Sequence, residues 1–484
     1  MIILGTNSIK DTGYNVDNSA RFDGTTAYLN RTPGSASNRK TFTFSTWIKR
    51  SGIAGVTVHQ DIFSSDAGDD ESYIHFDTDS LKIFSTLPSS AGASAGDPAC
   101  VLITTQKFRD FSAWMHIVVA VDTTQGTASN RVKLYINGTQ VTSFSTETYP
   151  DQNYQFATNA AVAHMIARRP AGGKFLPGYL AETVLVDGSQ LAPDQFGEFD
   201  SDSNIWKPID VSGLTFGTNG FYLDFEDSGA LGDDVSGNGN DFTVNNLTAI
   251  DSVSDVPTNN FATLNPLGNY FPASTFSEGN LKVTFNSSNY SFNNSTIGVS
   301  SGKWYFETKI ITAATDNQQL IGISDRDSIG TTDELGSGAY QYGFYGGNSG
   351  GDSGTGKVRN NNSYSSYSDG TTYTAGDIIG TYVDLDNNKI YFAKNGTILN
   401  SGTGFTITAP ASTDSGFYFL SVGSYSGSNS PVYEVNFGNP IFTGTDKSDA
   451  NGYGLFEYDP SVGTFDSASK DFYALNTKNL AEFG

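Results

Sequence analysis

Acidic residues gather in one loop-like stretch near the N-terminus. Asp66, Asp69, Asp70 and Glu71 lie within the sequence SSDAGDDESY. Carboxylate oxygens held close together suit calcium, a hard ion that takes about six to eight oxygen ligands. The spacing differs from that of an EF-hand loop, so a solvated acidic loop is the alternative. Calcium at these four residues is the one cofactor that the sequence suggests, and otherwise we expect none.

A second group of residues has the chemistry of carbohydrate binding. Tyrosine rings stack on sugar rings, and Asp and Asn side chains accept hydrogen bonds from sugar hydroxyls. Such residues lie after a predicted strand or beside long loops rich in Gly, Asn and Ser, and they are Asp325, Arg326, Asp327, Tyr345, Arg359, Tyr364 and Tyr367. The alternatives are a tyrosine-rich surface, or a subunit contact, with no ligand. Arg359 could instead pair with an acidic partner.

Catalytic chemistry finds less support. A glycoside hydrolase needs two carboxylates that flank the scissile bond, often on a strand with Glu-x-Asp-x-x-Glu spacing, and the chain has no such run. The histidines are His59, His75, His116 and His164, and no two of them have the spacing of metal ligands. We therefore expect no enzyme, and keep a polysaccharide-degrading enzyme as the least favoured alternative.

The elements that position these residues are predicted to be strands. The stretch Gly376–Gly396 alternates with a period of two, turns at Asp386-Asn387-Asn388 and ends in Asn-Gly, as a β-hairpin does. The stretch His116–Gly138 has the same plan, with Val121-Asp122 before the turn and Asn137-Gly138 at the end. Because both hairpins carry apolar residues on both faces, we place them centrally in two separate sheets.

The composition limits the class of protein. A chain of 484 residues exceeds one ordinary domain. The net charge of −24 argues against nucleic-acid binding, because phosphates require facing Lys and Arg side chains. Cys100 is the single cysteine, so an intrachain disulfide is excluded. No segment has the apolar length of a membrane span or the pattern of a secretory signal. We expect synthesis in a reducing cytosol and no membrane insertion.

Several pieces of the first part of the chain resemble the laminin-G-like, concanavalin-type jelly roll of many phage structural proteins. They are ARFDGTTAYL, FTFSTWIKR, WMHIVVAVDTT, VKLYING and GYLAETVLVDG. Five later pieces resemble, in order, a SPRY (B30.2) domain: GKWYFE, IGISD, YGFYG, GDIIGTYVDLDNNKIYFAKNG and VNFG. The resemblance implies an all-β chain of two concanavalin A-like β-sandwiches. It also implies that loops at one end of the SPRY-like sandwich, where the candidate sugar-binding residues fall, make a ligand surface.

The expected organisation has four parts. Residues 1–205 form the laminin-G-like sandwich, 206–270 a connector with some β content, 271–440 the SPRY-like sandwich, and 441–484 a tail. The tail sequence DFYALNTKNL resembles the ending of phage proteins that carry this SPRY module. The sequence therefore predicts a phage virion protein of a tail fibre, tail tip or capsid fibre, made in the host cytoplasm, which binds a host surface glycan or protein.

The partners follow from that prediction. They are other virion proteins and, through homo-oligomerisation, further copies of the chain, although no heptad repeat would drive a trimer. An architectural or decoration subunit that contacts only other virion proteins is the alternative from a different class.

Overall fold

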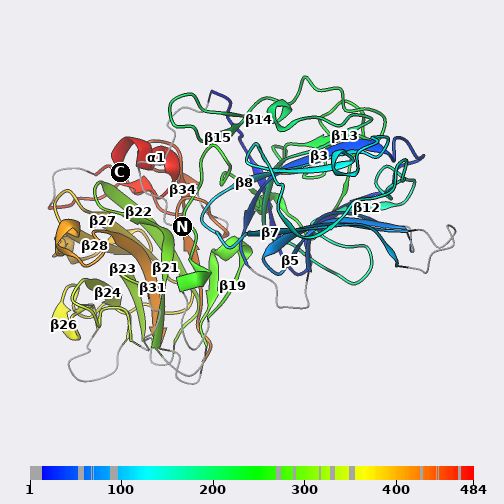
Figure 1. Cartoon of the computed structure of the whole chain (residues 1–484). Helices are drawn as coiled ribbons and strands as arrows, with labels where there is room; N and C mark the ends of the chain where they lie inside the picture. Colours follow the sequence, from blue (N-terminus) through cyan, green and yellow to red (C-terminus); the bar gives the residue numbers. More distant parts are fainter. Residues whose placement is uncertain are drawn as a thin grey trace. The chain divides into compact units, whose positions relative to one another are not determined.

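The computed structural model of the chain describes residues 13–52, 59–66, 68, 70–87, 96–268, 274–286, 290–314, 318–327, 333–347, 355–425, 429–442, 444, 446–466 and 470–484. These residues form two compact units, Asp11–Thr258 and Asn259–Gly484, and each is a β-sandwich (Figure 1). The all-β prediction of two sandwiches is confirmed, with α1 (Thr477–Phe483) as one short helix.

The first unit has a front sheet and a back sheet. The front sheet runs in the order β10 (Thr139–Gln140), β9 (Val132–Ile136), β8 (Met115–Asp122), β3 (Thr41–Arg50), β13 (Pro177–Asp187), β1 (Ser19–Asp23) and β18 (Ser252–Val253), and β16 (Phe221–Leu223) also pairs with β13. The back sheet runs β11 (Phe144–Thr148), β7 (Pro98–Lys107), β6 (Ser80–Thr86), β5 (Glu71–Asp77), β4 (His59–Asp66), β12 (Ala163–Ile166), β2 (Tyr28–Arg31) and β17 (Thr243–Asn245).

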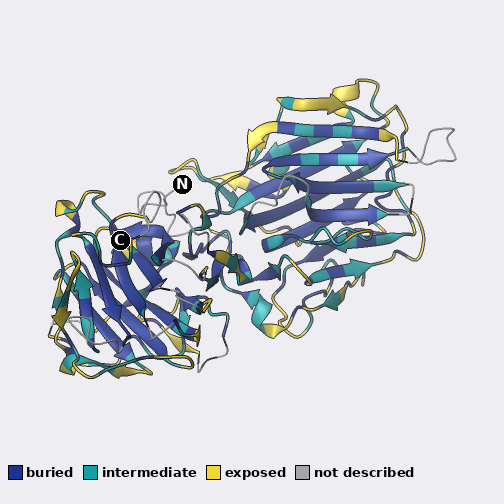
Figure 2. Ribbon diagram, turned by 90° about the horizontal axis from the view of Figure 1, so that it is seen from below, coloured by how far each residue is buried: buried dark blue, intermediate teal, exposed yellow. Residues whose placement is uncertain are grey.

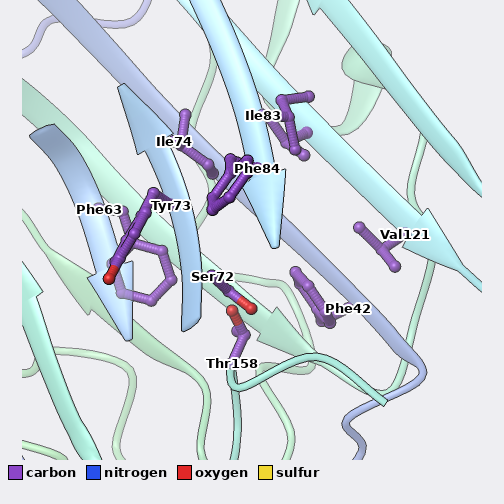
Figure 3. Close-up of a pocket in the computed structure, with 10 residues that line it drawn as sticks. Phe42, Phe63, Ser72, Tyr73, Ile74, Ile83, Phe84, Val121 and Thr158 are labelled. Atoms are coloured by element: carbon purple, nitrogen blue, oxygen red, sulfur yellow. The ribbon is translucent and has the colours of Figure 1, made fainter. Parts of the chain in front are cut away.

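Alternate residues of these strands fill the space between the two sheets. Phe44 of β3 stacks on Phe63 of β4, with ring centroids 4.8 Å apart, so aromatic contacts join the sheets directly. A cavity of about 20 Å³ remains in this region, large enough for about one water molecule. Figure 3 shows the hydroxyl groups of Ser72 and Thr158 pointing toward one another at its edge, among apolar side chains such as Val121.

The second unit repeats the plan. Its front sheet runs β19 (Thr275–Ser277), β20 (Lys282–Thr284), β32 (Val432–Asn436), β22 (Lys303–Thr312), β27 (Ile378–Asp384), β28 (Lys389–Lys394) and β29 (Thr397–Ile398), and β30 (Phe405–Thr406) and β35 (Tyr473–Ala474) join it. Its back sheet runs β21 (Tyr290–Val299), β31 (Tyr418–Tyr425), β23 (Gln319–Ser324), β24 (Gln341–Tyr345), β25 (Lys357–Asn360) and β26 (Ser363–Ser366). Phe344 of β24 stacks on Phe392 of β28, with centroids 4.8 Å apart.

Both predicted hairpins are present, and each of them ends in a turn of the same type. Asn137 and Gly138 have φ angles of 46° and 75°, and Asn395 and Gly396 have φ angles of 48° and 77°. Two successive positive φ angles are what a tight hairpin turn demands, and Asn-Gly adopts them at low cost. In each turn the asparagine Oδ1 accepts a hydrogen bond from a backbone N–H across the ladder, at 2.7 Å from His116 and 2.8 Å from Ile378.

The segment after each sandwich covers the outer face of its front sheet. In the first unit, Val118, Val184 and Val186 face outward and are buried under side chains that come mostly from the predicted connector: Phe196, Val211, Phe216 and Tyr222. Trp206 also lies there, on β15 (Trp206–Pro208), which pairs with β14 (Gly197–Phe199). The chain 206–258 is thus part of the first unit. Figure 2 shows that most residues along the central strands are buried.

The C-terminal segment covers the second front sheet in the same way. Phe456, Phe465 and Phe472 pack on Tyr305, Tyr382 and Tyr391 of β22, β27 and β28. Of these, Phe456 belongs to β34 (Leu455–Phe456), which pairs with β33 (Lys447–Ser448). The strand β35 pairs in parallel with the start of β22 through Trp304 and Tyr305. The tail is therefore an integral layer of this sandwich.

A buried glutamate fastens that layer. Glu307 is 0% exposed, and its carboxylate accepts hydrogen bonds from the backbone N–H groups of Glu457 and Tyr458 at 2.9 and 2.8 Å. The Asn436 side chain and the Tyr305 hydroxyl donate to the same carboxylate, each at 3.1 Å. Burial raises the pKa of Glu307 to about 7 in spite of these four donors.

No helix in the described part of the chain is both long enough and apolar enough to cross a membrane. Cys100 is buried and unpaired, and burial raises the pKa of its thiol to about 12, so the thiolate is strongly disfavoured.

Candidate ligand-binding site

A recessed cavity of about 430 Å³ opens at one end of the back sheet of the second unit. The residues that line it are Asn265, Asn294, Ser295, Thr296, Asp325, Arg326, Asp327, Ser415, Phe417 and Phe419. Strand pairing explains why they meet. β23 ends at Ser324, which pairs with Phe419 at the start of the antiparallel strand β31, so the residues after β23 and those before β31 share one edge of the sheet. The predicted residues Asp325, Arg326 and Asp327 thus lie together.

Hydrogen bonds hold the wall of this cavity in place. The Asn294 side chain donates to the Arg326 carbonyl at 2.8 Å, and the Ser324 hydroxyl donates to the same carbonyl at 2.6 Å. Asn294 Oδ1 in turn accepts from Ser421 Oγ at 2.8 Å. Asn294 lies where β21 shifts its register against β31, which turns this residue toward the loop after β23. The site is therefore built on the sheet.

Asp325 is the deepest charged residue of the cavity. It is 3% exposed, and among the described residues its Oδ2 atom has no hydrogen-bond partner. Burial raises the pKa of its carboxyl group, while a hydrogen bond from the backbone of Asp414 opposes that rise. Arg326 and Asp327 are exposed beside it, and Arg326 lies 3.7 Å from Asp333.

Sequence reasoning missed the aromatic wall of the site. Phe417 and Phe419 are both half-buried and both line the cavity. Tyr418, between them, points the other way: it is 0% exposed, and its hydroxyl donates to the Thr408 carbonyl at 2.9 Å. The alternation of Phe417-Tyr418-Phe419 indicates a strand with two rings on one face, but the sequence does not say that this face borders Asp325.

The other predicted ligand residues lie elsewhere. Tyr345 is 3% exposed and packs edge-on against Tyr364, with centroids 5.3 Å apart. Arg359 lies over the Tyr364 ring, 5.6 Å from its centroid, and forms an ion pair with Glu334 at 2.6 Å. These residues make a packed cluster on the back sheet, none of them lines the Asp325 cavity, and Arg359 does pair with an acidic residue.

Tyr367 belongs to the interior. It is 5% exposed, its ring packs against Phe344 and Phe392, and its hydroxyl accepts a hydrogen bond from the Phe392 backbone N–H at 3.2 Å. Neither Tyr345 nor Tyr367 offers a ring face for stacking on a sugar, because side chains of the same unit already cover both. The sequence placed them beside loops but could not say which way each ring points.

Three of the four residues predicted to bind calcium, Asp66, Asp70 and Glu71, lie at the hairpin between β4 and β5. Asp66 pairs with Glu71 in the ladder, Asp66 accepts a hydrogen bond from the Gly68 N–H at 2.6 Å, and Asp70 forms an ion pair with Arg39. Asp69 lies outside the described residues. Among those that are described, no three His, Cys, Asp or Glu side chains gather in a way that could hold a metal ion.

Comparison with known proteins defines the class of both units. A model described as the concanavalin A-like lectin/glucanases superfamily, of laminin G type, matches residues 23–194, and a SPRY domain model matches residues 303–431. The chain therefore contains a laminin G/concanavalin A-like domain followed by a SPRY domain. The description of the first model covers both lectins and glucanases.

Particular relatives share a shorter stretch. Ran-binding protein 9 of Danio rerio is 36% identical over 111 residues, which are 22% of this chain and 16% of that protein. The Homo sapiens protein of the same name is 35% identical over 111 residues, 22% of this chain and 13% of its own length. The matched stretch thus spans less than a fifth of either relative.

Two solved structures are also similar. The SPRY domain of human HERC1 is 16% identical with a TM-score of 0.28, over 36% of this chain and 96% of that one. A heptameric pentraxin from Limulus polyphemus is 16% identical with a TM-score of 0.28, over 37% of this chain and 80% of that one.

Proposed function

We propose that this protein is a structural component of a bacteriophage virion, in a tail fibre, tail tip or capsid fibre, and that it binds a glycan or protein of the host surface. The observation that carries the binding role is the cavity of about 430 Å³ beside Asp325, where half-buried phenylalanines and a buried carboxylate share one recess of a SPRY domain. Rigid sandwiches that present such recesses are suited to recognition. The virion assignment draws on the resemblance of DFYALNTKNL to phage protein endings.

The protein acts by binding, without catalysis. Two glutamates have pKa values raised to about 7, Glu182 and Glu307. Glu182 is 5% exposed and accepts a hydrogen bond from the Tyr222 hydroxyl at 2.9 Å, and Glu307 is enclosed beneath the C-terminal segment. They belong to different units, and neither lines the cavity beside Asp325. Their surroundings suit structural anchors better than a pair of carboxylates that cleaves a glycosidic bond.

An architectural subunit that contacts only other virion proteins is the second candidate. Phe199 favours it, because this side chain is 48% exposed and stacks edge-on against Trp206, with centroids 4.8 Å apart. An exposed aromatic residue backed by a tryptophan is typical of the centre of a protein–protein contact. Under this candidate, the Phe199–Trp206 pair contacts further copies of the chain and other virion proteins, and the protein has no host ligand.

One experiment separates the two candidates. Antibody-gold labelling of intact particles locates the protein, and adsorption of the purified chain to host cells, with competition against infecting particles, measures recognition. We expect labelling on a fibre or tip together with saturable adsorption that protects cells from infection. Labelling of the particle without adsorption would favour the architectural subunit, and absence of the protein from particles would overturn both.

A further inference from the structure

We propose that the cavity beside Asp325 binds a single neutral pyranose ring, a terminal or branching sugar of a cell-surface polysaccharide. The proposal rests on the binding role given above and names the ligand class of that site. It is argued from one buried oxygen, two aromatic rings and the balance of charge around them.

The buried oxygen is Asp325 Oδ2. A buried carboxylate oxygen is normally hydrogen-bonded, because leaving it unsatisfied forfeits the hydrogen bonds that water would otherwise give it. Asp325 is 3% exposed, and within the described residues nothing donates to its Oδ2, although the residue lines the cavity. A donor brought by a ligand would satisfy it when the carboxyl group turns this oxygen toward the cavity. Sugar hydroxyls are such donors, and they carry no charge that must be desolvated.

The aromatic wall supplies the other half of the recognition. Phe419 lies on β31 and Phe417 comes directly before the first residue of that strand, and both rings line the same recess. The C–H faces of a pyranose pack against aromatic rings while its hydroxyls point outward around the rim of the sugar. A cavity of about 430 Å³ lies in the lower half of the range of about 300–1,000 Å³ typical of small-ligand pockets. One ring is the size that this space suits.

Charge argues for a neutral sugar over an anionic one. Among the described residues that line the cavity, two are acidic, Asp325 and Asp327, and one is basic, Arg326, whose guanidinium lies 3.7 Å from Asp333. The whole chain carries a net charge of −24, so a sialylated or phosphorylated sugar meets repulsion both at the site and at long range. A cationic ligand would also satisfy Asp325, but Arg326 at the mouth opposes its approach.

The test uses the full chain and a panel of methyl pyranosides of glucose, galactose and mannose, with their N-acetylated forms, in saturation-transfer NMR and titration. The variants are Asp325→Ala and Phe417→Ala. Asp369→Ala removes an exposed aspartate of the same unit, and Phe276→Ala removes a half-buried phenylalanine of β19 in that unit, so these two serve as matched controls.

We expect at least one neutral pyranoside to bind, both site variants to weaken it at least tenfold, and both controls to leave it unchanged. Asp325→Ala should keep the melting temperature close to that of the wild type, because it removes both the unsatisfied Oδ2 atom and the acceptor of the Asp414 backbone hydrogen bond. A structural aspartate would instead lower the melting temperature on replacement. Lack of binding by every neutral pyranoside, binding that survives both site variants, or displacement by n-butylamine at equal concentration would overturn the proposal.

The outcome is separable from the virion role. Sugar binding that depends on Asp325, in a protein that does not adsorb to host cells, would leave the site standing while the virion role fails. Adsorption that persists in both site variants would leave the virion role standing while the sugar site fails.

Discussion

Protonation of Glu307 should control the stability of the second unit near neutral pH. This side chain is 0% exposed, and its carboxylate is held by four donors, two of which are backbone N–H groups of the C-terminal segment. Replacement by glutamine keeps the size and shape of the side chain but removes ionisation. Comparing the two proteins at each pH therefore isolates the titration of this one group from that of every other.

The magnitude follows from the pKa. Burial raises the pKa of Glu307 from 4.5 to about 7, so between these values the folded protein binds a proton that the unfolded chain has released. The stabilisation from this group is complete below pH 4.5 and is lost as the pH rises through 7. At about 1.4 kcal/mol for each pH unit, over the 2.5 units from 4.5 to 7, the unfolding free energy falls by about 3 kcal/mol relative to Glu307→Gln.

Pulsed hydrogen exchange across a urea series, read by mass spectrometry on peptides of β22 and β27, measures the unfolding of this unit alone. Glu434→Gln is the matched control, because Glu434 lies on β32 of the same sheet, where it pairs with Lys282 at 3.1 Å near the surface. The control should follow the wild-type pH profile. A wild-type minus Glu307→Gln difference that stays flat from pH 4.5 to 7 would refute the reasoning.

Three further predictions concern a hairpin turn, a buried ion pair and a cavity. Gly396→Ala should lower the melting temperature more than Gly370→Ala: both positions have positive φ, but a Cβ at 396 would lie 2.5 Å from the Tyr458 ring, whereas a Cβ at 370 meets nothing within 4 Å. The extra cost should be roughly 1–3 kcal/mol, and equal melting temperatures would contradict it. Lys49→Met should destabilise the first unit by roughly 3–5 kcal/mol in urea unfolding, because Lys49 is 1% exposed and lies 2.7 Å from the buried Asp255, which would lose this ion pair. Adding Asp255→Asn should restore part of that loss, and no restoration would show that the charge is not the cause. Val121→Ile should raise the unfolding free energy, measured by urea denaturation, by about 0.5 kcal/mol, since it fills a cavity of about 20 Å³ at roughly 24 cal/mol for each Å³. A loss of stability there would contradict the prediction, as expected if the cavity is too narrow for the added methylene group or holds a water molecule on Ser72 and Thr158.

Local patterns in the sequence predicted the sandwich class and both central hairpins. A period of two and an Asn-Gly turn are properties of neighbouring residues, so β27 and β28 could be read directly, and their register places Val383 opposite Ile390. The covering layers could not be read in this way. β18 pairs with β1 across more than 200 residues, as Val253 with Ser19, and nothing local in either strand names its partner.

Because sequence patterns show only local structure, they predicted part of the candidate site and missed the rest. Asp325, Arg326 and Asp327 are consecutive, so one strand end was enough to bring them together. Phe417 and Phe419 follow about 90 residues later and reach the cavity only through the pairing of β23 with β31. For Tyr345 and Tyr367, the deciding quantity was the direction in which each ring points from its strand or loop. That direction depends on the register of the strand. A shift of the register by one residue turns every side chain of the strand to the opposite face.

The covering layers set where the chain can be cut. Trp206 lies over the Gly138 turn and Tyr458 over the Gly396 turn, where an added Cβ would come within 2.4 and 2.5 Å of the two rings. Both aromatic residues lie beyond the stretches 23–194 and 303–431 that the family models match. A fragment limited to either stretch would expose the apolar outer face of its front sheet to water, and we expect it to aggregate. A version of either module for use on another scaffold, as a reagent or a sensor, must therefore include the segment that follows the matched stretch. The chain is then cut between Thr258 and Asn259.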